Sequence, residues 1–131
     1  MSVNVGEQLP PLDIRLTRTL IASAAIATRD YTEVHHDHEI ALERGSPDIF
    51  MNILTSNGLV GRYVTDWAGP AARIKKVSIR LGAPNYPGDT MHLRGEVAEI
   101  NGDEVTLKIV GSNSLGDHVT GTAVVTLPGK K

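Results

Sequence analysis

The sequence has no cysteine among its 131 residues, which excludes disulfide bonds, thiol catalysis and cysteine-ligated zinc. It also lacks a basic excess, because 15 Asp and Glu outnumber 13 Lys and Arg and give a formal charge of −2. A nucleic-acid binder normally shows the opposite balance, so we expect no nucleic-acid partner. No apolar run approaches the ~18 residues that a membrane-spanning helix needs, and no membrane association is expected.

The length of the chain is that of one domain. Hydrophobic residues make up 40% of the sequence, enough for a single core. We therefore expect one domain over residues 1–131. Residues 1–12 show no basic stretch followed by an apolar run, so no secretory signal is predicted and the location is expected to be cytoplasmic.

Alternation of apolar and polar side chains predicts several strands. The expected strands cover residues 12–16, 76–81, 91–97, 104–109 and 119–127. Tight turns are favoured by Asn101-Gly102-Asp103 and by Leu115-Gly116-Asp117. Consecutive strands joined by short turns form an antiparallel sheet, and here each strand has one apolar face.

Helices are predicted in the first half of the chain. Residues 20–27 are small and apolar and favour a short buried helix, while residues 37–44 favour one or two turns ended by Gly45. Ser46-Pro47-Asp48 combines a capping hydroxyl, a first-turn proline and an acid, so a second helix is expected to start there and to end around residues 67–70. Its apolar arc is too wide for a surface helix. An α+β fold in which a curved antiparallel sheet wraps around this long central helix satisfies both elements.

The polar segment from residue 30 to 37 is the strongest candidate for chemistry. Asp30 and His35 are five positions apart, and Asp37 follows two positions later. A carboxylate that orients an imidazole supports general acid/base catalysis near neutral pH. The five-residue offset fits neither one helix face nor one strand face, so we expect a bent loop in which the two side chains converge. Taken alone, the spacing fits a plain solvated loop as well.

A metal site is the alternative interpretation of the same segment, since His35, His36 and His38 flank Asp37. Adjacent histidines point in different directions on a regular backbone, and catalytic zinc usually draws its ligands from separate elements. We therefore predict no metal and no cofactor. His118, near the last predicted turn, is interpreted as a turn residue without a role in a site.

The Asp-x4-His-x-Asp pattern, with a central helix and a curved sheet, resembles the MaoC-like hot-dog family of (R)-specific enoyl-CoA hydratases and related dehydratases. The family's catalytic Asp and His match Asp30 and His35, and Asp37 matches its trailing acid. Residues 58–61 (Gly-Leu-Val-Gly) resemble the middle of the family's central helix, and residues 86–90 (Tyr-Pro-Gly-Asp-Thr) resemble the turn before its second long strand. The resemblance covers nearly the whole chain and implies a single hot-dog fold.

The same resemblance implies that Asp30 and His35 are the catalytic pair, adding water across the C2–C3 double bond of an acyl-CoA thioester. In the family, a glycine amide at the start of the central helix helps to bind the thioester oxygen. No glycine occurs between Pro47 and residue 57 here. We expect the backbone amides of Ile49 and Phe50, at the predicted helix start, to take that role.

Within the family, residues 29–37, 45–70 and 114–127 most resemble the small subunits of heteromeric hydratases that act on cholesterol side-chain CoA thioesters. This implies a steroid substrate and a second hot-dog subunit as partner, with a homodimer as the other possibility. Alternative functions are a homodimeric fatty enoyl-CoA hydratase, a 3-hydroxyacyl thioester dehydratase and a non-catalytic hot-dog partner subunit. The presence of both Asp30 and His35 argues against the last of these.

Overall fold

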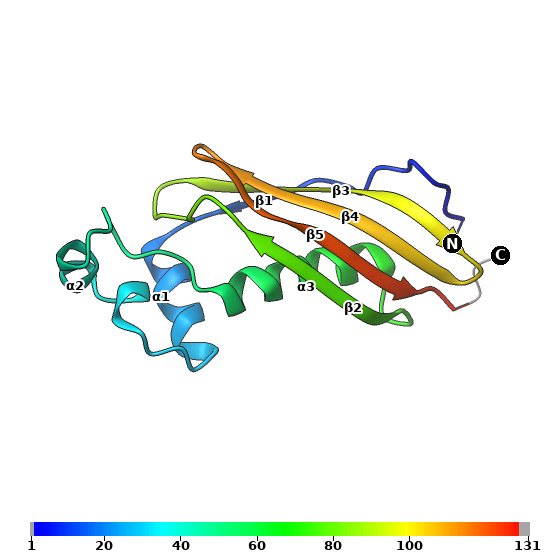
Figure 1. Ribbon diagram of the computed structural model, residues 1–131. Helices are drawn as coiled ribbons and strands as arrows, with labels where there is room; N and C mark the ends of the chain where they lie inside the picture. The colour runs from blue at the N-terminus through cyan, green and yellow to red at the C-terminus, as the bar shows by residue number, and fades with distance from the viewer. Residues whose placement is uncertain (1, 129–131) are drawn as a thin grey trace.

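The computed structural model describes residues 2–128 as one sheet packed on a long helix, with shorter helices gathered at one end (Figure 1). The elements are β1 (Leu12–Arg15), α1 (Arg18–Ala27), the 3-10 helix η1 (Glu33–His35), α2 (His38–Glu43), α3 (Ile53–Ala68), β2 (Arg73–Leu81), β3 (Thr90–Asn101), β4 (Glu104–Asn113) and β5 (Gly116–Thr126). Among the described residues, no helix is both long and apolar enough to cross a membrane.

The five strands form one sheet in the order β1-β3-β4-β5-β2, and every neighbouring pair is antiparallel. The register shifts between Ile74 and Lys76 in β2 and between Val97 and Glu99 in β3. Such bulges bend a strand and increase its twist, which helps the sheet to curve over α3. The predicted α+β architecture and the turn at Gly102 between β3 and β4 are confirmed.

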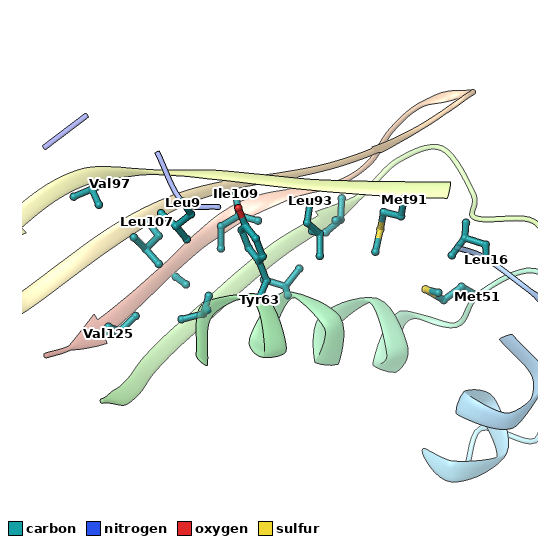
Figure 2. Close-up of a cluster of buried hydrophobic side chains, with 14 of the residues drawn as sticks. Leu9, Leu16, Met51, Tyr63, Met91, Leu93, Val97, Leu107, Ile109 and Val125 are labelled. Carbon is teal, nitrogen blue, oxygen red and sulfur yellow. The ribbon is translucent and has the colours of Figure 1, made fainter. Parts of the chain in front are cut away.

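The core lies between α3 and the concave face of the sheet (Figure 2). Val60, Tyr63 and Val64 of α3 are buried against apolar strand residues. The buried strand residues include Met91, Leu93, Val97, Leu107, Ile109 and Val125. Each such side chain contributes about 1.5–3 kcal/mol when it is fully buried. This core fixes the register of α3 against the sheet and therefore the position of its first turn, where the site lies.

The start of α3 differs from the prediction. The helix begins at Ile53 and not at Ser46-Pro47-Asp48. The intervening segment is irregular because the amides of Phe50 and Met51 donate to backbone carbonyls elsewhere in the chain, one before α2 and one after β2. These distant acceptors replace the helical hydrogen bonds that the local capping signals predicted.

Candidate active site

The end of α1 positions the backbone of Asp30. The N–H of Arg29 donates to Ile26 (3.0 Å) and the N–H of Asp30 donates to Ala25 (2.9 Å), the two bonds of a Schellman motif. The left-handed residue of this motif is usually glycine, but here it is Arg29, with φ of 60°. That conformation costs an L-residue roughly 1–2 kcal/mol. Asp30 is therefore tied to the helix and not to a free loop.

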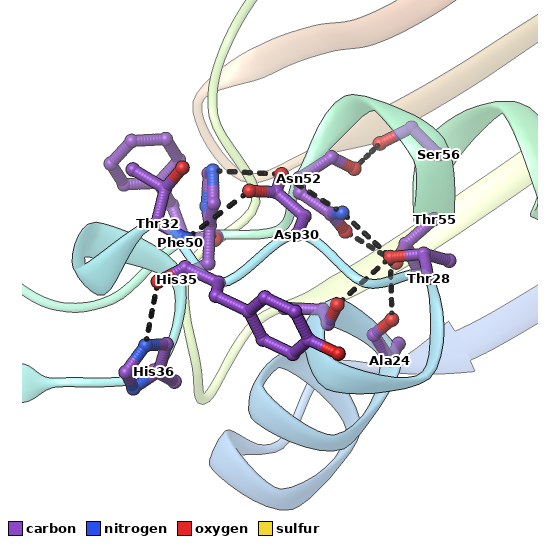
Figure 3. A network of polar contacts seen from close by, with 12 residues as sticks. Ala24, Thr28, Asp30, Thr32, His35, His36, Phe50, Asn52, Thr55 and Ser56 are labelled. Atoms are coloured by element: carbon purple, nitrogen blue, oxygen red, sulfur yellow. Dashed lines mark hydrogen bonds and ion pairs between the residues drawn. The ribbon is translucent and has the colours of Figure 1, made fainter.

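His35 ends η1 and is anchored by the segment that precedes α3 (Figure 3). Its Nδ1 lies 2.7 Å from the carbonyl oxygen of Phe50, and the two rings meet edge to face with centroids 4.8 Å apart. A carbonyl can only accept, so Nδ1 carries the proton and Nε2 of the neutral ring has a lone pair. The N–H of Phe50 donates back to the carbonyl of Val34 at 3.2 Å, which completes a two-way link.

The structure brings Asp30 and His35 together, as their spacing predicted. Nε2 of His35 lies 3.6 Å from Oδ2 of Asp30, and the side chains are 12% and 22% exposed, respectively. Two acceptors face one another at this distance when the imidazole is neutral. A single water molecule can donate to both, which is the usual way to bridge polar groups that are too far apart for a direct hydrogen bond.

Hydrogen bonds from two neighbours keep the Asp30 carboxyl ionised. The hydroxyl and the N–H of Thr32 donate to it, with the N–H at 3.3 Å, and Nδ2 of Asn52 donates at 3.2 Å. The hydrogen bonds from Thr32 come first among the causes that lower the pKa of Asp30 below its ordinary 3.8, and the hydrogen bond from Asn52 adds to them, as does the charge of the His35 ring when it is protonated. Partial burial works in the opposite direction. The carboxylate is therefore negatively charged at neutral pH.

Asn52, which the sequence analysis missed, is the buried centre of this polar network (Figure 3). Besides Asp30, its Nδ2 donates to the hydroxyl of Thr28 at 2.9 Å, and its Oδ1 accepts from the hydroxyl of Thr55. It is also the N-cap residue of α3. An Asn directly before the apolar run from Ile53 is a recognised N-cap signal, and this signal could have identified Asn52 from the sequence.

The amides expected to bind the thioester oxygen already have acceptors. The N–H of Ile49 donates to Asp48 Oδ1 at 2.8 Å, and the N–H of Phe50 donates to Val34. These bonds speak against Ile49 and Phe50 as oxyanion donors. By contrast, within residues 2–128 the N–H groups of Asn52 and Ile53 have no hydrogen-bond acceptor, and no side chain caps the first turn of α3.

A cavity of about 300 Å³ opens beside His35. Phe50 and Ile53 line one part of it, and Leu81 and Pro84, from the end of β2 and the following segment, line another. The lining is mostly apolar, and its polar side chains are the imidazoles of His35 and His118. Such a cavity suits the reacting end of an apolar acyl chain.

His118, interpreted from the sequence as a turn residue, lies in β5 and lines the same cavity. It is 2% exposed, with Nδ1 2.7 Å from the carbonyl of Ala83 and Nε2 2.7 Å from the hydroxyl of Ser56. Burial lowers the pKa of His118, so the ring is neutral and Ser56 donates to it. No local sequence pattern predicts this contact, because Ser56 and His118 are 62 positions apart.

The remaining histidines of the segment make separate contacts. Nε2 of His36 lies 3.2 Å from the carbonyl of Tyr31, and Nδ1 of His38 lies 2.9 Å from Oδ1 of Asp48. Across the part of the chain that the structure describes, no group of three or more His, Asp or Glu side chains is arranged to hold a metal ion.

Comparison with known proteins identifies the family. The family model described as "MaoC like domain" matches residues 3–117, and the chain belongs to the MaoC-like family. It is 53% identical over 123 residues to the 3-oxo-4,17-pregnadiene-20-carboxyl-CoA hydratase beta subunit of Mycobacterium tuberculosis, covering 94% of this chain and 95% of that protein. The predicted family is confirmed.

Two solved structures extend the comparison. A chain of the ChsH1-ChsH2 complex from Mycobacterium tuberculosis matches with a TM-score of 0.93 and 52% identity, covering 95% of this chain and 98% of that one. The (R)-hydratase from A. caviae involved in PHA biosynthesis matches with a TM-score of 0.87 and 22% identity, covering 96% and 98%. At that lower identity the likeness shows the fold alone, and the predicted hot-dog fold is confirmed.

Proposed function

We propose that this chain is an enoyl-CoA hydratase subunit that uses Asp30 and His35 to add water across the C2–C3 double bond of an acyl-CoA thioester. The observation that carries the proposal is the 3.6 Å approach of an ionised carboxylate to the imidazole Nε2, beside an apolar cavity. Membership of the MaoC-like family and 53% identity to a protein named as a hydratase subunit support the reaction class.

The proposed reaction uses the bridging water. As its oxygen bonds to C3, Nε2 of His35 takes one of its protons, and the π electrons of the double bond move toward the thioester oxygen. The resulting enolate then takes the proton back from His35 at C2. Asp30 orients the water and stabilises the imidazolium between the two steps, and the pair ends in its starting charge state. Positioned acid/base catalysis of this kind supplies about 10²- to 10⁴-fold.

The negative charge that develops on the thioester oxygen needs donors. We assign this role to the N–H groups of Asn52 and Ile53, which are unpaired within residues 2–128 and lie at the positive end of the α3 dipole. They replace Ile49 and Phe50 in the expected scheme. One such donor contributes about 10²- to 10³-fold.

The proposed substrate is a steroid side-chain enoyl-CoA. The reason is that the protein with 53% identity to this chain is named as a subunit of a pregnadiene-carboxyl-CoA hydratase. A cavity of about 300 Å³ is at the low end for ligand pockets, so a ring system needs further room from a partner. The proposed partner is a second hot-dog subunit, since the chain that this one matches was solved in a two-protein complex. Ile53 and Leu54 are 55% and 50% exposed on α3, which suits such a contact. The expected cytoplasmic location is part of the same proposal.

The test is a hydration assay with the chain alone and with a candidate second hot-dog subunit. We expect activity on a steroid enoyl-CoA that appears or rises strongly when the partner is added, and lower activity on crotonyl-CoA. Full activity of the lone chain on crotonyl-CoA, with none gained on the steroid substrate, would identify a homodimeric fatty enoyl-CoA hydratase instead. No activity on either substrate in any combination would contradict the hydratase proposal.

A further inference from the structure

Asp48, on the segment between α2 and α3, ties three parts of the chain together. Its Oδ2 lies 2.7 Å from Nη2 of Arg18 in α1, and its Oδ1 lies 2.9 Å from Nδ1 of His38 in α2. Oδ1 also accepts the N–H of Ile49 at 2.8 Å. The Asp48 side chain is 18% exposed, whereas Arg18 is 62% exposed, so the carboxylate is the sheltered centre of the cluster.

The side chain of Asp48 is ionised at neutral pH. Partial burial works to raise the pKa of this carboxyl, but the hydrogen bonds from Arg18, His38 and the Ile49 N–H outweigh burial and lower the pKa to about 2. The carboxylate therefore stays negatively charged, and so remains an acceptor for its neighbours, at the near-neutral pH of an enzyme assay.

The segment anchored by Asp48 leads directly to His35. Two positions after Asp48, the carbonyl of Phe50 accepts from Nδ1 of His35, and the N–H of Phe50 donates to Val34. The direction of this one carbonyl decides which imidazole nitrogen carries the proton. If the peptide turns away, nothing selects the tautomer that leaves Nε2 free to act as a base.

We propose that Asp48 is a positioning residue for the reaction: it holds residues 48–50 against α1 and α2 and so aims the Phe50 carbonyl at His35. Asp48 touches neither the cavity nor the reacting pair, and it acts only through Phe50. The expected effect of Asp48 on the reaction rate rests on the proposed function. Its expected effect on the tautomer of the His35 ring does not depend on any substrate.

The chain offers a matched control for a purely structural ion cluster. On β1, Asp13 Oδ1 lies 2.9 Å from Nδ1 of His92 and 3.0 Å from Nη1 of Arg94. The chemistry is the same, one carboxylate with one imidazole and one guanidinium, but Asp13 is 55% exposed and none of its hydrogen bonds leads to His35. Loss of Asp13 removes a cluster without disturbing the site.

The experiment compares Asp48→Ala, Asp48→Asn and Asp13→Ala in the complete enzyme, with its partner present. We expect Asp48→Ala to lower kcat at least about tenfold with KM changed less than about threefold, because small misplacements of a reacting group cost up to ~10²-fold. Asp48→Asn should recover part of the rate, since its amide oxygen can still accept the Ile49 N–H. Asp13→Ala should match the wild type.

The second readout is the nitrogen chemical shifts of the His35 ring, which report its tautomer without substrate. We expect the wild type and Asp13→Ala to show Nδ1–H, and Asp48→Ala to show a mixture of tautomers. An Asp48→Ala protein with an unchanged His35 tautomer would overturn the inference, as would equal changes in Asp13→Ala. If Asp48→Ala fails to fold, Asp48→Asn and Arg18→Gln carry the same test. A failed hydration assay with the expected tautomer change would contradict the proposed function alone.

Discussion

Two imidazoles in this protein are held alike and differ in what they can do. His35 and His118 each donate Nδ1–H to a backbone carbonyl at 2.7 Å, and both line the same cavity. Nε2 of His35 faces the Asp30 carboxylate at 3.6 Å, whereas Nε2 of His118 accepts the Ser56 hydroxyl at 2.7 Å. The tautomer is the same in both rings, so the surroundings of Nε2 make the difference.

The contrast separates a candidate base from a structural support. A base needs an unmet lone pair that a water molecule can reach, together with a negative charge that stabilises the protonated ring. His35 has both. His118 has both nitrogens occupied in a buried place, where leaving either one without a partner is costly, so it joins α3 to β5.

The largest expected effect comes from substituting His35 or its partner Asp30. We expect Asp30→Asn and His35→Gln each to lower kcat at least about 10²-fold with the fold intact. Because the two side chains act on one water in the proposed mechanism, the double variant should be little worse than either single variant. Steady-state kinetics with circular dichroism as the folding control make the measurement. A single variant that keeps more than half of the wild-type rate would remove the residue from the proposed mechanism.

A smaller effect is expected on the structural side. Ser56→Ala removes the donor to Nε2 of His118 and leaves a buried acceptor unsatisfied, which should lower the free energy of unfolding by about 1–3 kcal/mol. The rate should stay within the same order of magnitude. Ser23→Ala, an exposed site in α1, is the control and should change stability by less than about 0.5 kcal/mol. Unchanged stability with a large loss of rate would place Ser56 in the catalytic machinery.

The smallest expected effect is on the pH dependence of stability. Burial lowers the pKa of His118 in the folded state, so near pH 6 the unfolded chain binds more protons at this position than the folded chain. This part of the stability is present above about pH 6.5 and is lost as the pH falls below it, by at most about 1.4 kcal/mol between pH 7.5 and 5.5. Urea unfolding at both pH values should show that the free energy of unfolding falls less with decreasing pH in His118→Gln than in the wild type. An identical loss in both proteins would mean that His118 does not contribute.

Local patterns predicted most of the fold. Alternation located the long strands, and Gly102 and Gly45 adopt the positive φ that their predicted turn and helix end require. The start of α3 was misplaced because Ser46-Pro47-Asp48 carries every local sign of a helix start, while the carboxylate of Asp48 is taken by Arg18, 30 positions away. Short-range signals do not reveal a distant partner.

The same limit applies to the site. Asp30 and His35 were recognisable because both lie within one short segment and match a family motif. Asn52 and Asp30 are 22 positions apart and Ser56 and His118 are 62 apart, so these contacts exist only after the helix has packed on the sheet. The amides proposed to bind the thioester oxygen are those at the start of α3. They could not be identified from the sequence because the start of this helix was misplaced.

The Schellman motif at the end of α1 makes the acid part of a cooperative folding unit. Since the N–H of Asp30 completes the hydrogen bonds of a ten-residue helix, any fluctuation that unravels this helix end also withdraws the carboxylate from His35. The left-handed backbone of Arg29 favours such opening, while Ile21 and Ala25, both fully buried, oppose it. The fraction of molecules with Asp30 placed beside His35 is then set by a local opening equilibrium, which amide hydrogen exchange at Asp30 would report directly, and not by global unfolding.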